Sequence, residues 1–122
     1  MATNSFSSLA EFLNLPELLE RVENDEDLLR ELLALFQEDL PASRNALQTA
    51  IAGGDLTEIE RAAHRMKGML ANLSAKQAAS LAAEIESAAR AGDSLKIPEL
   101  ISLFDPQIAT LSAALGSFLA SD

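Results

Sequence analysis

The sequence contains no cysteine, tryptophan or tyrosine, and it has a single histidine. Without cysteine the chain can form neither a disulfide bond nor a thiolate metal site. One histidine without a calcium-loop pattern leaves only scattered carboxylates, so no metal site is expected. No apolar run approaches the roughly 18 residues that cross a bilayer, and the N-terminus lacks the features of a secretory signal. We therefore expect a cytoplasmic protein without membrane contact.

Basic residues are scarce as well: 9 Lys and Arg stand against 19 Asp and Glu, which gives a net charge of −10. Such a chain repels phosphate backbones, so binding to nucleic acid is not expected. Apolar residues make up 48% of the 122 residues, enough for one core and a single domain over residues 1–122. Leu and Ala favour helices, and valine, a strand-forming residue, occurs once.

Proline, glycine and capping residues divide the chain into helical runs. The expected runs cover residues 5–13, 16–22, 25–53, 55–73, 76–91 and 98–120. Asn24 or Asp25 caps the third run, Pro41 is expected to kink it, and Pro106 kinks or divides the last run. Short connections between neighbouring runs predict an all-α fold, an antiparallel up-down four-helix bundle with a short additional N-terminal helix.

Apolar residues recur at spacings of three and four in the two central runs, which defines the faces expected to be buried. The stripe of the third run contains Leu28, Leu29, Leu32, Leu33, Phe36, Leu40, Leu47 and Ile51. The stripe of the next run contains Leu56, Ile59, Ala63, Met66, Leu70 and Leu73.

His64, the only histidine, falls on the side of its helix opposite this apolar stripe, because successive residues are about 100° apart. The imidazole is therefore expected in solvent. Its own stripe continues with Lys67, Gly68 and Ala71, and cations flank it at Arg61, Arg65 and Lys67. A phosphoryl group on the ring would add roughly two negative charges, which these cations would offset.

Gly68 lies one turn after His64, where glycine costs a helix about 1 kcal/mol relative to alanine. We favour the interpretation that the missing side chain lets another protein approach the imidazole. The alternatives are close packing against a neighbouring helix and simple tolerance of the glycine.

The turn at Ser74-Ala75 predicts which residue faces His64. In an antiparallel pair joined there, residues at the same height have numbers that sum to about 150, so His64 faces Glu86. That carboxylate can accept a hydrogen bond from Nδ1 and leave Nε2 as the nucleophile, although most helical Glu residues are simply solvated. The same arithmetic pairs Arg90 with Glu60, which we interpret as an exposed ion pair outside the site.

The stretch HRMKGMLANLSA at residues 64–75 resembles the signature of histidine-containing phosphotransfer domains, roughly H-x-L-K-G-S-x-x-N-L-G. The resemblance extends across nearly the whole chain and implies a stoichiometric phosphohistidine carrier. It implies that His64 is phosphorylated, Lys67 assists the phosphoryl group, Gly68 gives clearance and Glu86 orients the ring. Arg61, Arg65 and Ala71 are expected, with Gly68, to contact the partner.

The resemblance also implies the partners. The carrier would take its phosphoryl group from the aspartate of a receiver domain, as in a hybrid sensor histidine kinase pathway, and pass it to the receiver domain of another response regulator. No cofactor is expected, since the Mg²⁺ belongs to the receiver, and a monomer is favoured. The initiating Met1 suggests a free-standing protein.

The sequence departs from the signature at three positions. Met66 replaces the usual Leu, Ser74 replaces the usual turn glycine, and Met69 stands where a small residue is common. Met66 is a volume-conserving change, and Met69 is expected to be half-buried.

Two other functions remain as alternatives. The chain could be a helical adaptor that binds signalling partners and never carries phosphate. It could also be an enzyme that uses His64 and Glu86 as a general-base pair, although no nucleophile, oxyanion site or nucleotide-binding loop accompanies them. Autophosphorylation from ATP is not expected, because the chain has no room for an ATP-binding domain.

Overall fold

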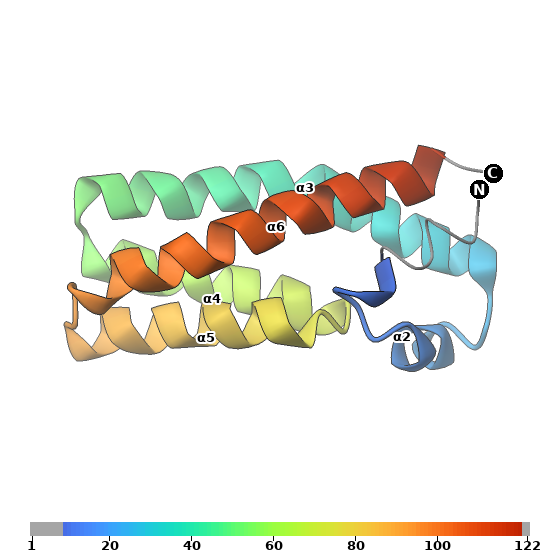
Figure 1. Ribbon diagram of the computed structural model, residues 1–122, viewed down its shortest axis with the longest axis horizontal. Coiled ribbons are helices and arrows are strands. Elements are labelled where there is room, and N and C mark those ends of the chain that lie inside the picture. The colour runs from blue at the N-terminus through green and yellow to red at the C-terminus, as the bar shows by residue number, and fades with distance from the viewer. Residues whose placement is uncertain (1–8, 121–122) are drawn as a thin grey trace.

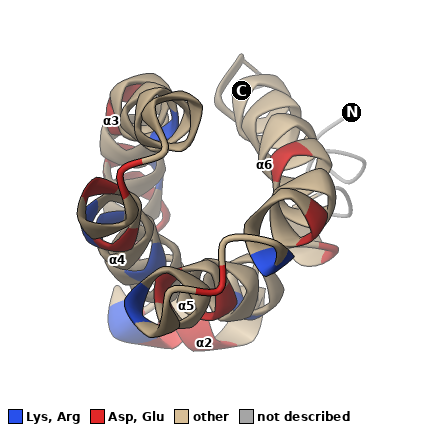
Figure 2. Cartoon of the chain, turned by 90° about the vertical axis from the view of Figure 1, so that its left-hand side faces the viewer, with Lys and Arg blue, Asp and Glu red and all other residues tan. Residues whose placement is uncertain are grey.

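The computed structural model describes residues 9–120, and this part of the chain is helical without strands. Its helices are α2 (Leu15–Arg21), α3 (Glu26–Gly53), α4 (Leu56–Asn72), α5 (Lys76–Ala91) and α6 (Lys96–Ala120). The four long helices run up and down beside one another, and the short α2 packs at one end (Figure 1). Seen along the bundle, α3, α4, α5 and α6 follow one another around a shared interior (Figure 2). The all-α bundle predicted from the sequence is confirmed.

Capping residues set the ends of the helices close to their predicted positions. Asp25, rather than Asn24, caps α3, with its Oδ1 accepting a hydrogen bond from the Leu28 backbone at 3.1 Å. Asp55 caps α4 by accepting from the backbone nitrogens of Thr57 and Glu58. At the other ends, α3 and α5 stop where glycines adopt the left-handed conformation.

Neither internal proline interrupts its helix. Pro41 lies inside α3 and Pro106 inside α6. Of the two alternatives at Pro106, a kink or a division, the division is wrong because α6 is one helix. The last helix also begins at Lys96, two residues before Pro98. Proline is tolerated there because the N–H groups of the first turn have no intrahelical acceptor, so no hydrogen bond is lost. The expected run over residues 5–13 lies partly outside the described residues.

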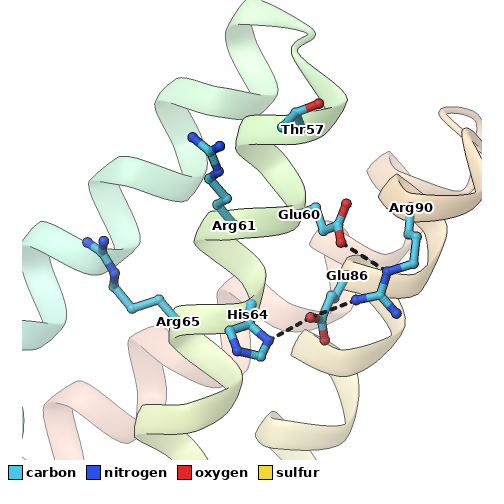
Figure 3. Close-up of a pocket in the computed structure, with 7 residues that line it drawn as sticks. All are labelled: Thr57, Glu60, Arg61, His64, Arg65, Glu86 and Arg90. Carbon is cyan, nitrogen blue, oxygen red and sulfur yellow. Dashed lines mark hydrogen bonds and ion pairs between the residues drawn. The ribbon is translucent and has the colours of Figure 1, made fainter.

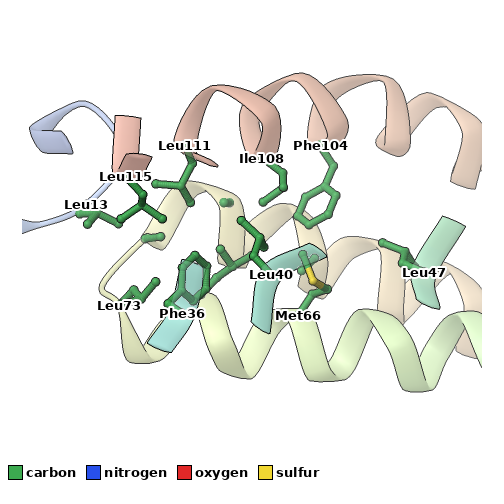
Figure 4. Packing of buried hydrophobic residues seen from close by; sticks show 14 of the residues in the cluster. Leu13, Phe36, Leu40, Leu47, Met66, Leu73, Phe104, Ile108, Leu111 and Leu115 are labelled. Atoms are coloured by element: carbon green, nitrogen blue, oxygen red, sulfur yellow. The ribbon is translucent and has the colours of Figure 1, made fainter. Parts of the chain in front are cut away.

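The core lies between the four long helices and continues under the N-terminal segment (Figure 4). The predicted stripe of α4 is buried from Ile59 to Leu73, with Leu56 partly buried. On α3 the expectation for Leu28 is wrong, since this residue is 46% exposed. It lies at the edge of the stripe near the start of the helix, while Ser43 occupies a buried position between Leu40 and Leu47. In the part described, no helix is both long and apolar enough for a membrane span.

Candidate functional site

The site is built on the hairpin of α4 and α5. After α4 ends, Ser74 takes a left-handed conformation with φ of 57°, and α5 begins two residues later. This conformation explains why glycine is the usual residue in the signature. The backbone oxygen of Ser74 accepts a hydrogen bond from the Asn14 nitrogen at 2.8 Å, so the N-terminal segment anchors the turn. A short, fixed turn makes the register of the two helices definite.

That register brings His64 of α4 against Glu86 of α5 (Figure 3). The expected hydrogen bond is present: Nδ1 of His64 lies 2.7 Å from Oε2 of Glu86. Because an ionised carboxylate only accepts, Nδ1 carries the proton and the lone pair of a neutral ring lies on Nε2. The His64 side chain is 67% exposed, whereas that of Glu86 is only 6% exposed. The ring is therefore exposed to solvent, while its Nδ1 is hydrogen-bonded to a buried carboxylate.

Glu86 is held in its charged form by its neighbours. Lys67 donates from Nζ to Oε1 at 2.6 Å, one turn along α4 from the histidine. The hydrogen bond from Lys67, followed by the one from His64, lowers the pKa of Glu86 below its ordinary value of 4.5, although burial acts in the opposite direction. A buried carboxylate is thus ionised because cationic and polar donors surround it.

Arg90 also belongs to this cluster, which corrects the expectation that it forms only an exposed ion pair. Its Nε bonds Oε2 of Glu60 at 2.9 Å, as the hairpin register predicted. Its Nη2 reaches Oε2 of Glu86 at 3.1 Å, the same oxygen that receives His64. Since Arg90 follows Glu86 by four residues, the i, i+4 spacing was the signal that could have revealed this second bond.

Gly68 lies exposed on α4, and a Cβ there would meet no atom within 4 Å beyond its chain neighbours and the nearby backbone of its own helix. Close packing against a neighbouring helix is therefore wrong as the reason for this glycine. Ala71 is exposed one turn further along. The same surface of α4 thus carries small side chains beyond the imidazole.

Arg61 and Arg65 extend from α4 on the side away from α5, so they flank the ring without joining the Glu86 cluster (Figure 3). Arg61 pairs with Glu58 at 3.1 Å on the same helix, and both arginines are exposed. The residues around His64 line a shallow surface hollow, which contains Thr57, Glu60, Arg61, His64, Arg65, Glu86 and Arg90.

The remaining departures from the signature are Met66 and Met69 of α4. Met66 is fully buried in the core. Met69 is half-buried, as expected, and its sulfur accepts a hydrogen bond from the Ser43 hydroxyl at 3.1 Å. Within residues 9–120, no group of three or more acidic or histidine side chains is placed to hold a metal ion.

The sequence and the fold are similar to those of known proteins. The sequence matches the family described as Hpt domain over residues 31–116. No curated protein sequence matches. Histidine-containing phosphotransfer protein B (HptB) from Pseudomonas aeruginosa PAO1 has a similar structure, with a TM-score of 0.80 and 27% identity over 88% of this chain and 94% of that one.

The HPT domain of the Hpt sensor hybrid histidine kinase from Shewanella shares the fold, with a TM-score of 0.75 and 23% identity over 89% of this chain and 94% of that one. The family match spans most of the chain and includes the whole α4–α5 hairpin. The chain therefore belongs to the Hpt domain family, and its function is phosphotransfer in a phosphorelay.

Proposed function

We propose that His64 is the residue that carries the phosphoryl group, taking it from the aspartyl phosphate of one receiver domain and giving it to the aspartate of another. The observation that carries this proposal is the exposed ring whose Nδ1 bonds a buried carboxylate. Such a ring presents its second nitrogen, with a free lone pair, to any protein that docks on α4.

The transfer step follows from the tautomer. The lone pair of Nε2 attacks the phosphorus of the aspartyl phosphate, the N–P bond forms, and the P–O bond to the aspartate breaks. The aspartate leaves as a carboxylate. The proton remains on Nδ1, so the phosphorylated ring carries a positive charge that Glu86 stabilises through their hydrogen bond. The reverse step, with a second receiver, returns the ring to its neutral form.

The other site residues have supporting roles in this proposal. Lys67 lies one turn from the ring and meets the phosphoryl oxygens during transfer. Arg61, Arg65, Gly68 and Ala71 contact the receiver. The chain supplies no metal, because the Mg²⁺ of the reaction sits in the acidic pocket of the receiver, and it has no kinase activity of its own. We place this chemistry in the cytoplasm, with the chain acting as a monomer.

The test is transfer from a receiver domain that has been phosphorylated with acetyl [³²P]phosphate and freed of the small molecule. We expect label to move to this chain, and the label to be labile in acid and stable in base, as phosphohistidine is. The His64→Gln variant is expected to take up no label while its circular dichroism spectrum stays unchanged, because the ring is exposed and contributes little to the core.

Three outcomes would contradict the proposal. Label that persists in His64→Gln would mean that another residue is phosphorylated, and acid-stable label would mean a different bond. Failure of the parent chain to accept label from any receiver domain would favour the adaptor function. Incubation with ATP alone is the control for kinase activity, and no label is expected from it.

A further inference from the structure

Lys67 is already engaged in the unphosphorylated chain. Its ammonium lies 2.6 Å from Oε1 of Glu86, and its side chain is 35% exposed. A phosphoryl group on the exposed Nε2 of His64 would compete with Glu86 for this ammonium, because it adds about two negative charges beside it. Phosphorylation in the proposed role therefore draws Lys67 away from Glu86.

Loss of Lys67 would be costly for Glu86 unless another cation remained. The Glu86 side chain is 6% exposed, and a buried carboxylate that loses its partner pays a desolvation penalty. A protonated Glu86 would no longer offset the positive charge of a phosphorylated ring. The orientation of His64 thus depends on whatever holds Glu86 after Lys67 has moved.

Arg90 is placed for this task. Its Nη2 bonds Oε2 of Glu86 at 3.1 Å, while its Nε is fixed by Glu60 of α4 at 2.9 Å. A carboxylate oxygen offers two lone pairs, so Oε2 can accept from Arg90 and from His64 together. The guanidinium lies on the α5 side of the ring, and Glu60 keeps it there (Figure 3).

We propose that Arg90 is a positioning residue, which keeps Glu86 ionised and bonded to Nδ1 of His64 when Lys67 turns to the phosphoryl group. The inference rests on the proposed function. Arg90 affects the His64 ring only through Glu86, and the hydrogen bond to Glu60 fixes the position of Arg90. Lys67 can then move between the Glu86 carboxylate and the phosphoryl group while the orientation of the His64 ring stays unchanged.

Arg61 provides a matched comparison. It is also an exposed arginine near His64 that pairs with a glutamate, but its partner is Glu58 and it points away from α5 (Figure 3). Removing either arginine takes one positive charge from the surface near the ring. Only the removal of Arg90 takes a donor from Glu86. The two variants therefore separate positioning from the general attraction of a cationic surface.

The experiment measures single-turnover transfer from a phosphorylated receiver domain at increasing receiver concentration, for the parent, Arg90→Gln, Arg90→Lys and Arg61→Gln. For Arg90→Gln we expect the maximal rate to fall about tenfold, equivalent to about 1.4 kcal/mol, with little change in the half-saturating concentration. Arg90→Lys is expected to recover most of that rate. Arg61→Gln is expected to raise the half-saturating concentration and leave the maximal rate nearly unchanged.

Nitrogen NMR of the His64 ring gives a second readout. We expect Nδ1 of unphosphorylated Arg90→Gln to resemble that of the parent, since Lys67 still holds Glu86. In the phosphorylated proteins the Nδ1 shift is expected to differ, because the hydrogen bond to Glu86 weakens only in the variant. A purely structural loss would change both states alike.

The results also separate this inference from the carrier function. If the parent is phosphorylated on His64 but Arg90→Gln transfers at the parent's rate, or changes only the half-saturating concentration, then the positioning role is wrong and the carrier stands. Identical Nδ1 shifts in the phosphorylated parent and variant would also overturn it. If the parent takes no label, both proposals fall.

Discussion

Gly68 combines an exposed place on α4 with open space around it. Glycine inside a helix is less favourable than glutamine by about 0.5 kcal/mol. We therefore predict that Gly68→Gln raises the free energy of unfolding in urea while it weakens receiver docking, seen as a higher half-saturating concentration in the transfer assay. Stability and function are expected to move in opposite directions at this residue.

Gly53, the last residue of α3, is the matched control, because a Cβ there would also meet nothing within 4 Å beyond its chain neighbours and the nearby backbone of its own helix. Gly53→Gln is expected to leave receiver docking at the parent's value. If Gly68→Gln docked equally well, clearance for a partner would not be the reason for the glycine.

Glu86 makes the stability of the protein depend on pH. Lys67 and then His64 lower its pKa in the folded chain below the ordinary 4.5, so the unfolded chain binds the proton first as the pH falls. Stability from this group is fully present above about pH 5 and is lost as acidification passes through the folded-state pKa. We expect the free energy of unfolding of Glu86→Gln to fall less steeply between about pH 5 and 3 than that of the parent. Parallel curves would contradict this assignment.

At the scale of elements, α2 holds the end of the α4–α5 hairpin. Nη1 of Arg21 donates to the backbone oxygens of Asn72 at 2.9 Å and Ala71 at 3.2 Å. The last carbonyls of a helix lack intrahelical partners, so a side chain from another element caps α4. The short N-terminal helix thereby fixes the hairpin on which the site is built.

Glu17, also on α2, reaches the turn itself. Its Oε1 accepts a hydrogen bond from the Ser74 hydroxyl at 2.7 Å, and its Oε2 pairs with Lys76 at 2.7 Å. Serine at this left-handed position therefore gains a side-chain contact that glycine would lack, which offsets part of the backbone strain. The departure from the signature is explained by a partner on α2.

Removal of the cap tests this arrangement. We predict that Arg21→Ala lowers the free energy of unfolding by about 1 kcal/mol, because two backbone oxygens lose a charged donor that is itself partly exposed. Phosphotransfer is expected to persist, since these bonds are made at the end of α4. Arg61→Ala, which removes a pair made within one helix, is the control and is expected to change stability by less than about 0.5 kcal/mol in thermal unfolding. Equal losses for the two variants would show that α2 does not support the hairpin.

At the scale of the whole molecule, the fold could be predicted because local sequence signals determine where each helix begins and ends. Asp55 accepts backbone hydrogen bonds at the start of α4, and Gly92 adopts the left-handed conformation after α5. A short turn of known position then placed His64 against Glu86. Spacing alone predicted the carboxylate beside the ring and the exposure of the ring, whereas the bond from Lys67 to Glu86 was not predicted.

The missed features depend on how elements meet. Arg90 bonds both Glu60 and Glu86, and the hairpin register alone predicts only the bond to Glu60. The continuity of α6 through Pro106 depends on packing over its whole length. Leu28 fits the helical period but lies near the start of α3, where the neighbouring helices do not cover it. Periodicity predicts the direction of a side chain but not the presence of a covering element.

In the proposed role the chain has one acceptor atom, because the sequence has one histidine and its ring is exposed on α4. In the proposed role a single copy serves one client at a time, so donor and acceptor compete for it. Each copy carries one phosphoryl group at a time, so the number of phosphoryl groups delivered cannot exceed the number received. The number of copies in the cell then sets the maximal rate of phosphoryl transfer through the pathway. An abundant receiver that binds the chain without transfer would lower the rate of transfer to every other receiver.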